Sequence, residues 1–319
     1  MKPMRHYCTY FDRNYLARGL VLHQSLEKHS EGDFRLYVLC LDEQTESVLK
    51  SLGKSTIIPV ALRDVEAWDP DLLEAKANRS TVEYYFTLSP VLPLYVLEHF
   101  DCDLITYLDA DLMFFSPPEA IFDELGDKSI FTTGHRFPQR LKDLEAYGRF
   151  NVQCQSFRKS DAGLACLHRW REQCLGWCYD RFEDGKFADQ KYLDEWPGLY
   201  GEHLVISQHP GIGVAPWNVS AVQLKCDASV WMVGCDPLVF YHFHDLKFLG
   251  RRWLKTGLGQ YHAPISSELR SLYSAYCNHI IRATKRVAVD RLSKHDSRFS
   301  HGWTRIFLNG IRQRDLMWR

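Results

Sequence analysis

Two aspartates placed one residue apart are the leading candidates for chemistry in this 319-residue chain. Residues 104–115 read LITYLDADLMFF, so an apolar segment typical of a strand leads directly into Asp109 and Asp111. Carboxylates at i and i+2 of an extended segment point to the same side, and burying two like charges there is costly without a cation. Oxygen ligands in this pattern suit Mn²⁺ or Mg²⁺, which usually also hold substrate phosphates. The pattern therefore predicts a divalent metal that binds a diphosphate.

A turn is the alternative explanation for the same triplet. Asp-x-Asp is common in turns, where each aspartate accepts a hydrogen bond from a neighbouring backbone N–H. The apolar segment before Asp109 and the apolar residues 112–115 make a turn less favoured. Both interpretations stay open on the triplet alone.

A late apolar segment, residues 239–244, predicts a strand that ends in His242-Phe243-His244. Histidines at i and i+2 share one face of a strand, so either could complete a metal site. For an isolated His-x-His pair, hydrogen-bonded core or surface histidines are the more frequent explanation. The Asp-x-Asp pair elsewhere in the chain makes metal ligation a competing explanation for these histidines.

Two basic residues, Lys76 and Arg79, precede a predicted helix. They would neutralise a pyrophosphate, with the arginine acting as a bidentate fork. Solvated charges at the start of a helix would have the same pattern.

Two further polar pairs have both a sugar-binding and a structural interpretation. Asp189-Gln190 offers a carboxylate and an amide to sugar hydroxyls, or lies at the start of a helix. Trp217-Asn218 joins an aromatic face to an amide, as sugar sites often do, or belongs to a packed loop.

Strands and helices alternate through the first hundred-odd residues, which predicts an α/β protein with a mainly parallel central sheet flanked by helices. Ligands bind such sheets at the carboxyl ends of strands, where Thr9–Asp12 and the Asp109/Asp111 pair both lie. Pro90 and Pro93 are expected to kink or split one long helix. We predict strands at 5–10, 34–41, 55–60, 104–108 and 129–133, and helices at 14–29, 81–99 and 166–182.

Length and charge predict one enlarged domain, residues 1–262, followed by a basic, mainly helical extension, residues 263–319. From residue 267 to the end there are 11 lysines and arginines against 4 acidic residues. One hypothesis is that this tail lies on an anionic membrane; packing on the body or on a second subunit is the alternative. The membrane hypothesis depends on an apolar set and a basic set, namely Trp303, Ile306, Phe307, Leu308, Ile311, Met317 and Trp318 with Arg305, Arg312, Arg314 and Arg319.

Several classes of protein are disfavoured by what the chain lacks. No apolar stretch is long enough for a signal peptide or a membrane span, and the ten cysteines fit reduced thiols. We therefore expect a cytoplasmic protein, with the tail as the hypothetical contact to the inner membrane. No Gly-x-Gly-x-x-Gly or Gly-Lys-Ser/Thr loop is present, so a dinucleotide dehydrogenase or P-loop enzyme is not expected. No nucleic-acid partner is expected.

In their order along the chain, these motifs resemble those of a GT-A glycosyltransferase. The arrangement is similar to the glycogenin and lipopolysaccharide galactosyltransferase family, and more closely to a bacterial group of predicted nucleotide-diphospho-sugar transferases. The resemblance covers roughly residues 5 to 250. It depends on residues 9–12, 107–111, 150–151 and 189–190, and its closer form depends on 83–87, 177–181, 187–194 and 242–244.

The resemblance implies a role for each matching residue. Asp109 and Asp111 would bind Mn²⁺ or Mg²⁺, and His242 or His244 would be the third protein ligand. Asp189 is the first candidate for the catalytic group, with Gln190 and Asn151 lining the donor sugar beside it. The other residues implied in donor binding are Thr9, Phe11, Asp12, Tyr15, Lys76, Arg79 and Trp217.

The activity implied is metal-dependent transfer of a sugar from a nucleotide-diphosphate donor, a UDP-sugar as first guess, to a glycan or lipid-linked acceptor. The favoured biological role is bacterial surface polysaccharide synthesis. The favoured stereochemistry is retention of the anomeric configuration. A nucleotidyltransferase shares the sheet and an acidic metal site, but its Gly-rich phosphate loop is absent. A non-catalytic binding protein with the same fold is the alternative of a different class.

Two positions depart from the pattern of the group. Gln153 stands where a glycine would allow close approach to the donor sugar. We therefore expect either a narrower donor pocket or a different donor. Asp245 follows His-Phe-His where glycine is usual, and it would be an additional ligand.

Overall fold

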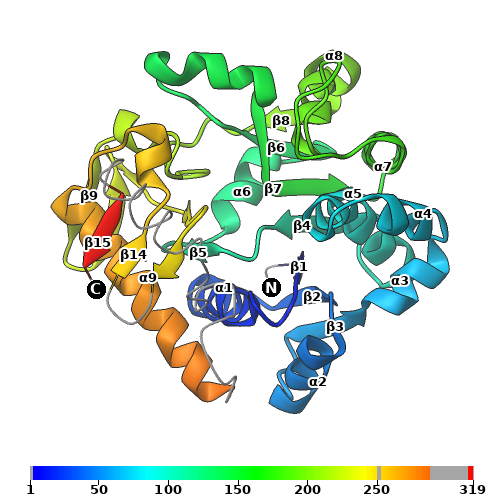
Figure 1. Ribbon diagram of the computed structural model, residues 1–319, viewed down its shortest axis with the longest axis horizontal. Helices are drawn as coiled ribbons and strands as arrows, with labels where there is room; N and C mark the ends of the chain where they lie inside the picture. Colours follow the sequence, from blue (N-terminus) through cyan, green and yellow to red (C-terminus); the bar gives the residue numbers. More distant parts are fainter. Residues whose placement is uncertain (1–2, 250–252, 288–314, 319) are drawn as a thin grey trace.

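A seven-stranded sheet in the order β3-β2-β1-β4-β7-β6-β8 forms the centre of the computed structural model, which describes residues 3–249, 253–287 and 315–318 (Figure 1). The first four of these strands are parallel, β7 runs antiparallel to β4 and β6, and β8 is parallel to β6. The prediction of a mainly parallel α/β sheet is confirmed. The strand bounds are β1 (Arg5–Phe11), β2 (Phe34–Cys40), β3 (Ile57–Ala61), β4 (Leu104–Leu108), β6 (Ile130–Gly134), β7 (Phe150–Arg158) and β8 (Leu204–Ile206).

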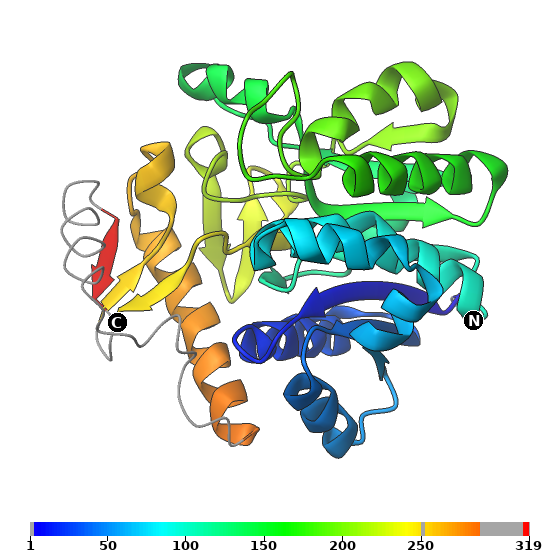
Figure 2. The same cartoon turned by 45° about the vertical axis from the view of Figure 1, so that its right-hand side comes forward.

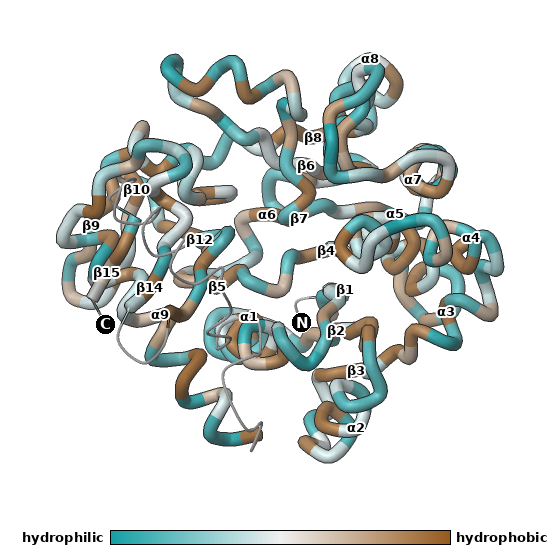
Figure 3. The backbone as a smooth tube through the Cα atoms, viewed as in Figure 1, coloured by the Kyte–Doolittle hydropathy of each residue, from teal (hydrophilic) through white to brown (hydrophobic). Residues whose placement is uncertain are grey.

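Helices cover both faces of this sheet because successive strand residues point to opposite sides. Tyr7 of β1 belongs to a core shared with α1 and α9, whereas the adjacent Cys8 belongs to a core shared with α5 and α7. Hydrophobic and hydrophilic residues alternate along outer helices such as α2 (Figure 3). The helix bounds are α1 (Leu16–His29), α2 (Glu43–Leu52), α3 (Leu62–Trp68), α4 (Asp71–Asn78), α5 (Thr81–His99), α6 (Glu119–Leu125), α7 (Asp161–Gly176), α8 (Trp196–Tyr200) and α9 (Ser267–Arg286).

Smaller sheets lie beside the central one. The chain turns after β4 into β5 (Leu112–Phe114), which pairs antiparallel with β12 (Phe240–His242) and brings His242 opposite Leu112. One three-stranded sheet is a meander of β9 (Leu224–Asp227), β10 (Val230–Val233) and β11 (Asp236–Pro237). The other consists of β13 (Lys247–Leu249), β14 (Trp253–Lys255) and β15 (Leu316–Trp318).

Two helix predictions need correction. The bounds of the 81–99 helix are confirmed, but the helix is not split, because α5 runs unbroken from Thr81 to His99 with both Pro90 and Pro93 buried inside it; a kink at the prolines stays a prediction. Each proline removes one backbone hydrogen bond, but the buried apolar face of this helix and its Ser80 capping box stabilise the whole length. The 166–182 helix begins earlier and ends earlier, since α7 is capped by Ser160 and its last residue is Gly176.

Parts of the expected extension pack on the body of the protein. The helix α9 lies along α1, as both views show (Figures 1 and 2), and β15 pairs with β14 with Met317 buried. The rest of the apolar and basic tail up to Arg314, with Arg319, lies outside the described residues, and the division at residue 262 stays a prediction. Among the described residues, no helix is long and apolar enough to cross a membrane.

Acid sensitivity is expected from His23 of α1, which is 2% exposed and 2.8 Å from the Thr56 hydroxyl. Burial lowers the pKa of His23 to about 4, so between pH 6.5 and 4 the unfolded chain takes up a proton that the native protein does not. Stability therefore falls as the pH falls through this window, by about 1.4 kcal/mol per pKa unit. We expect His23→Gln to reduce the loss between pH 7 and pH 5 by about 2 kcal/mol, measured by urea unfolding.

The matched control for this prediction is His168→Gln, which changes an exposed histidine in the same way. It should leave the pH dependence of the free energy of unfolding as in the wild type. An unchanged pH dependence in His23→Gln would contradict the assignment.

Candidate metal and donor site

A cluster of three side chains forms at the carboxyl end of β4. Asp109 and Asp111 follow this strand directly, and the β5–β12 pairing brings His242 to them from a distant part of the chain. The ligand atoms of the three residues all lie within 4.8 Å of one another. The Nε2 atom of His242 is 3.0 Å from Asp111 Oδ1 and 3.8 Å from Asp109 Oδ2. Two carboxylates and an imidazole at this spacing can hold one divalent cation.

The three side chains of this cluster are largely buried, and their charges shift one another's pKa values. Burial raises the pKa of Asp109 to about 6; His242 opposes this shift and Asp111 adds to it. Burial also acts to raise the pKa of Asp111, but His242, His244 and Arg18 outweigh it and lower that pKa. For His242, burial acts to lower the pKa, and the two aspartates outweigh it and raise it. The charged forms of His242 and Asp111 therefore stabilise each other.

The outer partners of the cluster come from neighbouring strands. The Tyr107 hydroxyl donates a hydrogen bond to Asp109 Oδ1 (2.9 Å), and the backbone N–H of Asp109 donates to the Gln153 carbonyl (3.0 Å). The side-chain oxygen of Gln153 lies 3.1 Å from His242 Nδ1. We did not predict the roles of Tyr107 and Gln153 from the sequence. The only signal was that Gln153 stands where the related group has a glycine.

Of the two histidines, His242 belongs to the cluster and His244 does not. Trp217 is 2% exposed and packs edge-on against both rings, with centroid distances of 5.3 Å to His242 and 5.6 Å to His244. Asp245 is not part of the cluster and its carboxylate forms ion pairs with Lys247 and Lys255, which favours a structural role; an additional ligand there stays a prediction. Its φ of 55° explains why a glycine suits this position.

The residues expected to contact the nucleotide divide into buried and accessible ones. Thr9 is fully buried, and Phe11 is 3% exposed with its ring against Gly19, where any side chain would clash. Asp12 accepts hydrogen bonds from the backbone N–H groups of Asn14 (2.9 Å) and Tyr15 (3.2 Å). Tyr15 is 39% exposed. Asp12 and Tyr15 therefore form the accessible part of this segment.

Both basic residues expected at the phosphates are engaged elsewhere. Lys76 pairs with Glu66 at 2.6 Å. The guanidinium of Arg79 donates to the carbonyls of Cys174 and Leu175 at the end of α7, as helix C-caps often do. These contacts favour the structural interpretation, and a phosphate role for either residue stays a prediction.

Asp189 is buried beside the cluster. Its carboxylate accepts a hydrogen bond from the Ser89 hydroxyl (2.7 Å), which is itself 3.2 Å from the Tyr10 hydroxyl. Burial raises the pKa of Asp189 to about 7, the Ser89 hydrogen bond opposes this, and the charge of Asp109 adds to it. The charge of Asp109 therefore reaches Asp189.

The two amides expected at the donor sugar have partners within the protein. Asn151 accepts from the Gln153 backbone N–H (3.0 Å) and lies 3.1 Å from His135 Nε2. Gln190 donates to the Tyr147 carbonyl (3.0 Å). These contacts hold both amides in place, and each keeps a second N–H for another acceptor.

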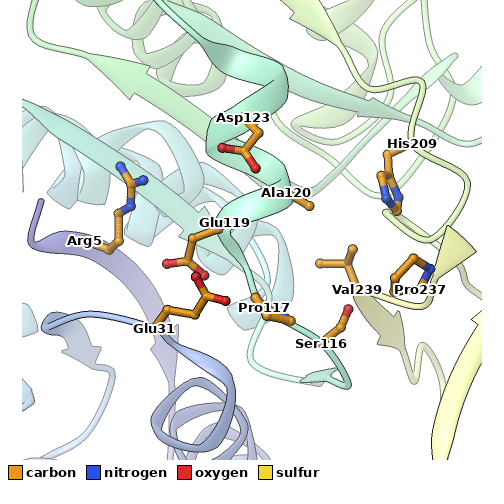
Figure 4. A pocket seen from close by; sticks show the side chains of 10 residues that line it. All are labelled: Arg5, Glu31, Ser116, Pro117, Glu119, Ala120, Asp123, His209, Pro237 and Val239. Atoms are coloured by element: carbon orange, nitrogen blue, oxygen red, sulfur yellow. The ribbon is translucent and has the colours of Figure 1, made fainter. Parts of the chain in front are cut away.

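A separate pocket of about 380 Å³ lies near the beginning of β1, away from the carboxyl ends of the strands (Figure 4). Arg5, which begins β1, lines it together with Glu31, Glu119 and Asp123. The metal cluster lies at the carboxyl ends of the strands, so this pocket is not part of the candidate site.

No model of a known protein family matches the chain. Two solved structures share its fold across most of their length. Their sequence identities to this chain are low, so the likeness shows the fold alone. The galactosyltransferase LgtC, solved with donor and acceptor sugar analogs, has a TM-score of 0.53 at 15% identity and covers 94% of this chain and 99% of its own. Mouse xyloside xylosyltransferase 1 has a TM-score of 0.50 at 14% identity, with coverages of 76% and 98%. The fold is the GT-A fold of glycosyltransferases, as the motifs implied.

Two curated proteins are similar in sequence. The chain is 32% identical over 244 residues to the uncharacterized protein YfnD of Bacillus subtilis, covering 75% of this chain and 76% of YfnD. It is 31% identical over 290 residues to the uncharacterized protein YfnF of the same organism, covering 86% and 92%. At this identity and coverage, the chain belongs to the protein family of YfnD and YfnF.

Proposed function

We propose that this protein is a metal-dependent glycosyltransferase that uses a nucleotide-diphosphate sugar. The observation that supports this most is the gathering of Asp109, Asp111 and His242 at the carboxyl edge of a GT-A sheet. LgtC, which shares the fold, was solved with donor and acceptor sugar analogs. A UDP-sugar is the first donor to test, and a glycan or lipid-linked saccharide is the proposed acceptor.

The residues present fit a divalent cation such as Mn²⁺ or Mg²⁺. The side chain of Gln153 accepts from His242 Nδ1, which leaves Nε2 facing the two carboxylates as a ligand. A bound cation supplies Lewis-acid stabilisation of the charge that develops on the leaving diphosphate. The carboxylates of Asp109 and Asp111 would hold that cation at the carboxyl end of β4, where ligands bind sheets of this kind.

Nucleotide recognition is proposed for the segment that follows β1. The Asp12 carboxylate is held by hydrogen bonds to the next turn, so it is pre-organised to accept from ribose hydroxyls. The Tyr15 ring is accessible on one side, and the Arg18 guanidinium lies 4.6 Å from its centre on another. A base would stack on the accessible face.

Asp189 is proposed as the catalytic carboxylate, with Asn151 and Gln190 lining the donor sugar. As a carboxylate beside the anomeric carbon, it would stabilise positive charge that develops on the sugar ring. Retention of configuration and a place in bacterial surface polysaccharide synthesis belong to the same proposal. A membrane contact through the tail is the part with least support, because Met317 is buried in the protein.

Metal-dependent nucleotide binding tests the proposal directly. We expect isothermal titration with UDP, GDP and CMP, each with and without Mn²⁺, to show binding of one nucleotide that requires the metal. Asp111→Asn removes a ligand while keeping the side-chain shape, so it should weaken this binding by more than the roughly 10- to 100-fold that loss of an outer partner costs.

The control for this titration is Asp180→Asn, which changes an exposed aspartate in the same way. It should bind as the wild type does. If none of the three nucleotides binds the wild-type protein with Mn²⁺, an active nucleotide-sugar transferase is ruled out and a non-catalytic protein on this fold becomes the better explanation.

The role of Asp189 predicts a pH dependence of turnover with the donor so identified. Because the pKa of this carboxyl is raised to about 7, turnover should fall as the pH falls through 7 and the carboxylate takes up a proton. Asp189→Asn should lower kcat by roughly 10²- to 10⁴-fold and remove that pH step, with nucleotide affinity unchanged. Release of the nucleoside diphosphate measures both, and an identical pH profile in the variant would contradict the role.

A further inference from the structure

We infer that Gln153 is a positioning residue that fixes the ring of His242 so that Nε2, rather than Nδ1, faces the metal site. This inference deepens the proposed function and rests on its metal site. It also assigns a role to Gln153, which stands where the related group of transferases has a glycine.

The first step is the contact between the two buried side chains. Gln153 lies in β7 and is fully buried, and His242 in β12 is 4% exposed. The distance from Gln153 Oε1 to His242 Nδ1 is 3.1 Å. An amide oxygen can only accept a hydrogen bond, so Nδ1 must carry the proton in this contact. Nε2, the atom 3.0 Å from Asp111 Oδ1, is then the ring nitrogen that would offer its lone pair to a cation, which takes the place of any proton shared with that carboxylate.

The second step is what orients the amide, since its oxygen and nitrogen are distinguished by their partners. Gln153 Nε2 lies 3.2 Å from the Thr133 hydroxyl oxygen, and that hydroxyl donates its single proton to the Asn151 carbonyl. The hydroxyl oxygen is therefore left to accept from the amide NH₂. A one-way sequence of hydrogen bonds runs from His242 through Gln153 and Thr133 to the backbone at Asn151.

The third step is that the backbone of Gln153 supports the other side of the site. Its carbonyl accepts from the Asp109 N–H (3.0 Å), and its own N–H donates to the Asn151 side chain (3.0 Å). One residue therefore positions the main chain of one proposed ligand and the ring of another. The room for its side chain depends on Gly213, where an added Cβ would lie 3.1 Å from Gln153 Nε2.

Hydrogen bonds of this kind to the second ring nitrogen fix the tautomer of a metal-bound histidine and raise its basicity, and their loss typically costs 10- to 100-fold in metal affinity. A glycine at position 153 would offer no side-chain acceptor. The metal affinity of this protein should thus depend on a side chain that never contacts the metal.

The test compares Mn²⁺ affinity in the full-length protein, measured from the electron paramagnetic resonance signal of free Mn²⁺. Gln153→Met keeps the length of the side chain and removes the acceptor oxygen, so Mn²⁺ affinity should fall by roughly 10- to 100-fold. Pulsed measurements on bound Mn²⁺ should also lose the histidine nitrogen coupling seen in the wild type. Gln153→Glu keeps an acceptor oxygen for Nδ1–H and should restore both the affinity and the nitrogen coupling.

The matched control is Gln155→Met, because Gln155 is equally buried in the same strand and makes one side-chain hydrogen bond, to the Asn151 carbonyl (2.7 Å). It should leave both readouts unchanged. Wild-type affinity and nitrogen coupling in Gln153→Met would overturn the inference, as would an equal loss in Gln155→Met. No Mn²⁺ binding by the wild type would overturn the proposed metal site itself, so the two failures are distinguishable.

A second pair of variants decides the matter if Gln153→Met does not fold. Thr133→Val removes the hydroxyl that orients the amide, and Thr133→Ser keeps it. The inference requires weaker Mn²⁺ binding and reduced nitrogen coupling in the valine variant only. Equal affinities in the two variants would overturn it.

Discussion

The repulsion between two neighbouring carboxylates in a largely buried site is the constraint on which the rest of this structure depends. Asp109 and Asp111 have side chains only 27% and 13% exposed, and two like charges cannot remain there uncompensated. The interaction with His242 lowers the pKa of Asp111 and opposes the rise in the pKa of Asp109, and Arg18 also acts to lower the pKa of Asp111. A bound divalent cation would take over the same task.

The architecture explains how these groups meet. The turn after β4 reverses the chain into β5, and the antiparallel pairing of β5 with β12 brings His242 to the aspartates from far along the sequence. On the other side of β4, the pairing with β7 places Gln153 beside Asp109. The strands β7 and β12 thus each contribute one polar group, and helices α1 and α5 cover the two faces of the sheet around them.

Much of this was predictable because local patterns encode it. Near-continuous apolar segments predicted β2 and β4 closely, since a strand buried on both faces needs no polar side chain. The bounds of α5 were predicted correctly, but the expected split is absent, because the two prolines are a local signal that burial of the surrounding helix overrides. Asp109 and Asp111 were identified from their spacing together with the apolar residues on either side, whereas the choice between His242 and His244 required the β5–β12 register.

The fold class, the strand that precedes the candidate metal site and the two candidate carboxylate ligands all followed from the chain's local patterns. Those features depend on side-chain periodicity and on residues adjacent along the chain. Only the tertiary structure decided which histidine completes the cluster, that Arg79 donates to the end of α7, and that Gln153 contacts His242. These contacts join residues 89 or more positions apart, and hydrogen-bond partners at such separations are set by strand pairing and helix packing, which no local pattern encodes.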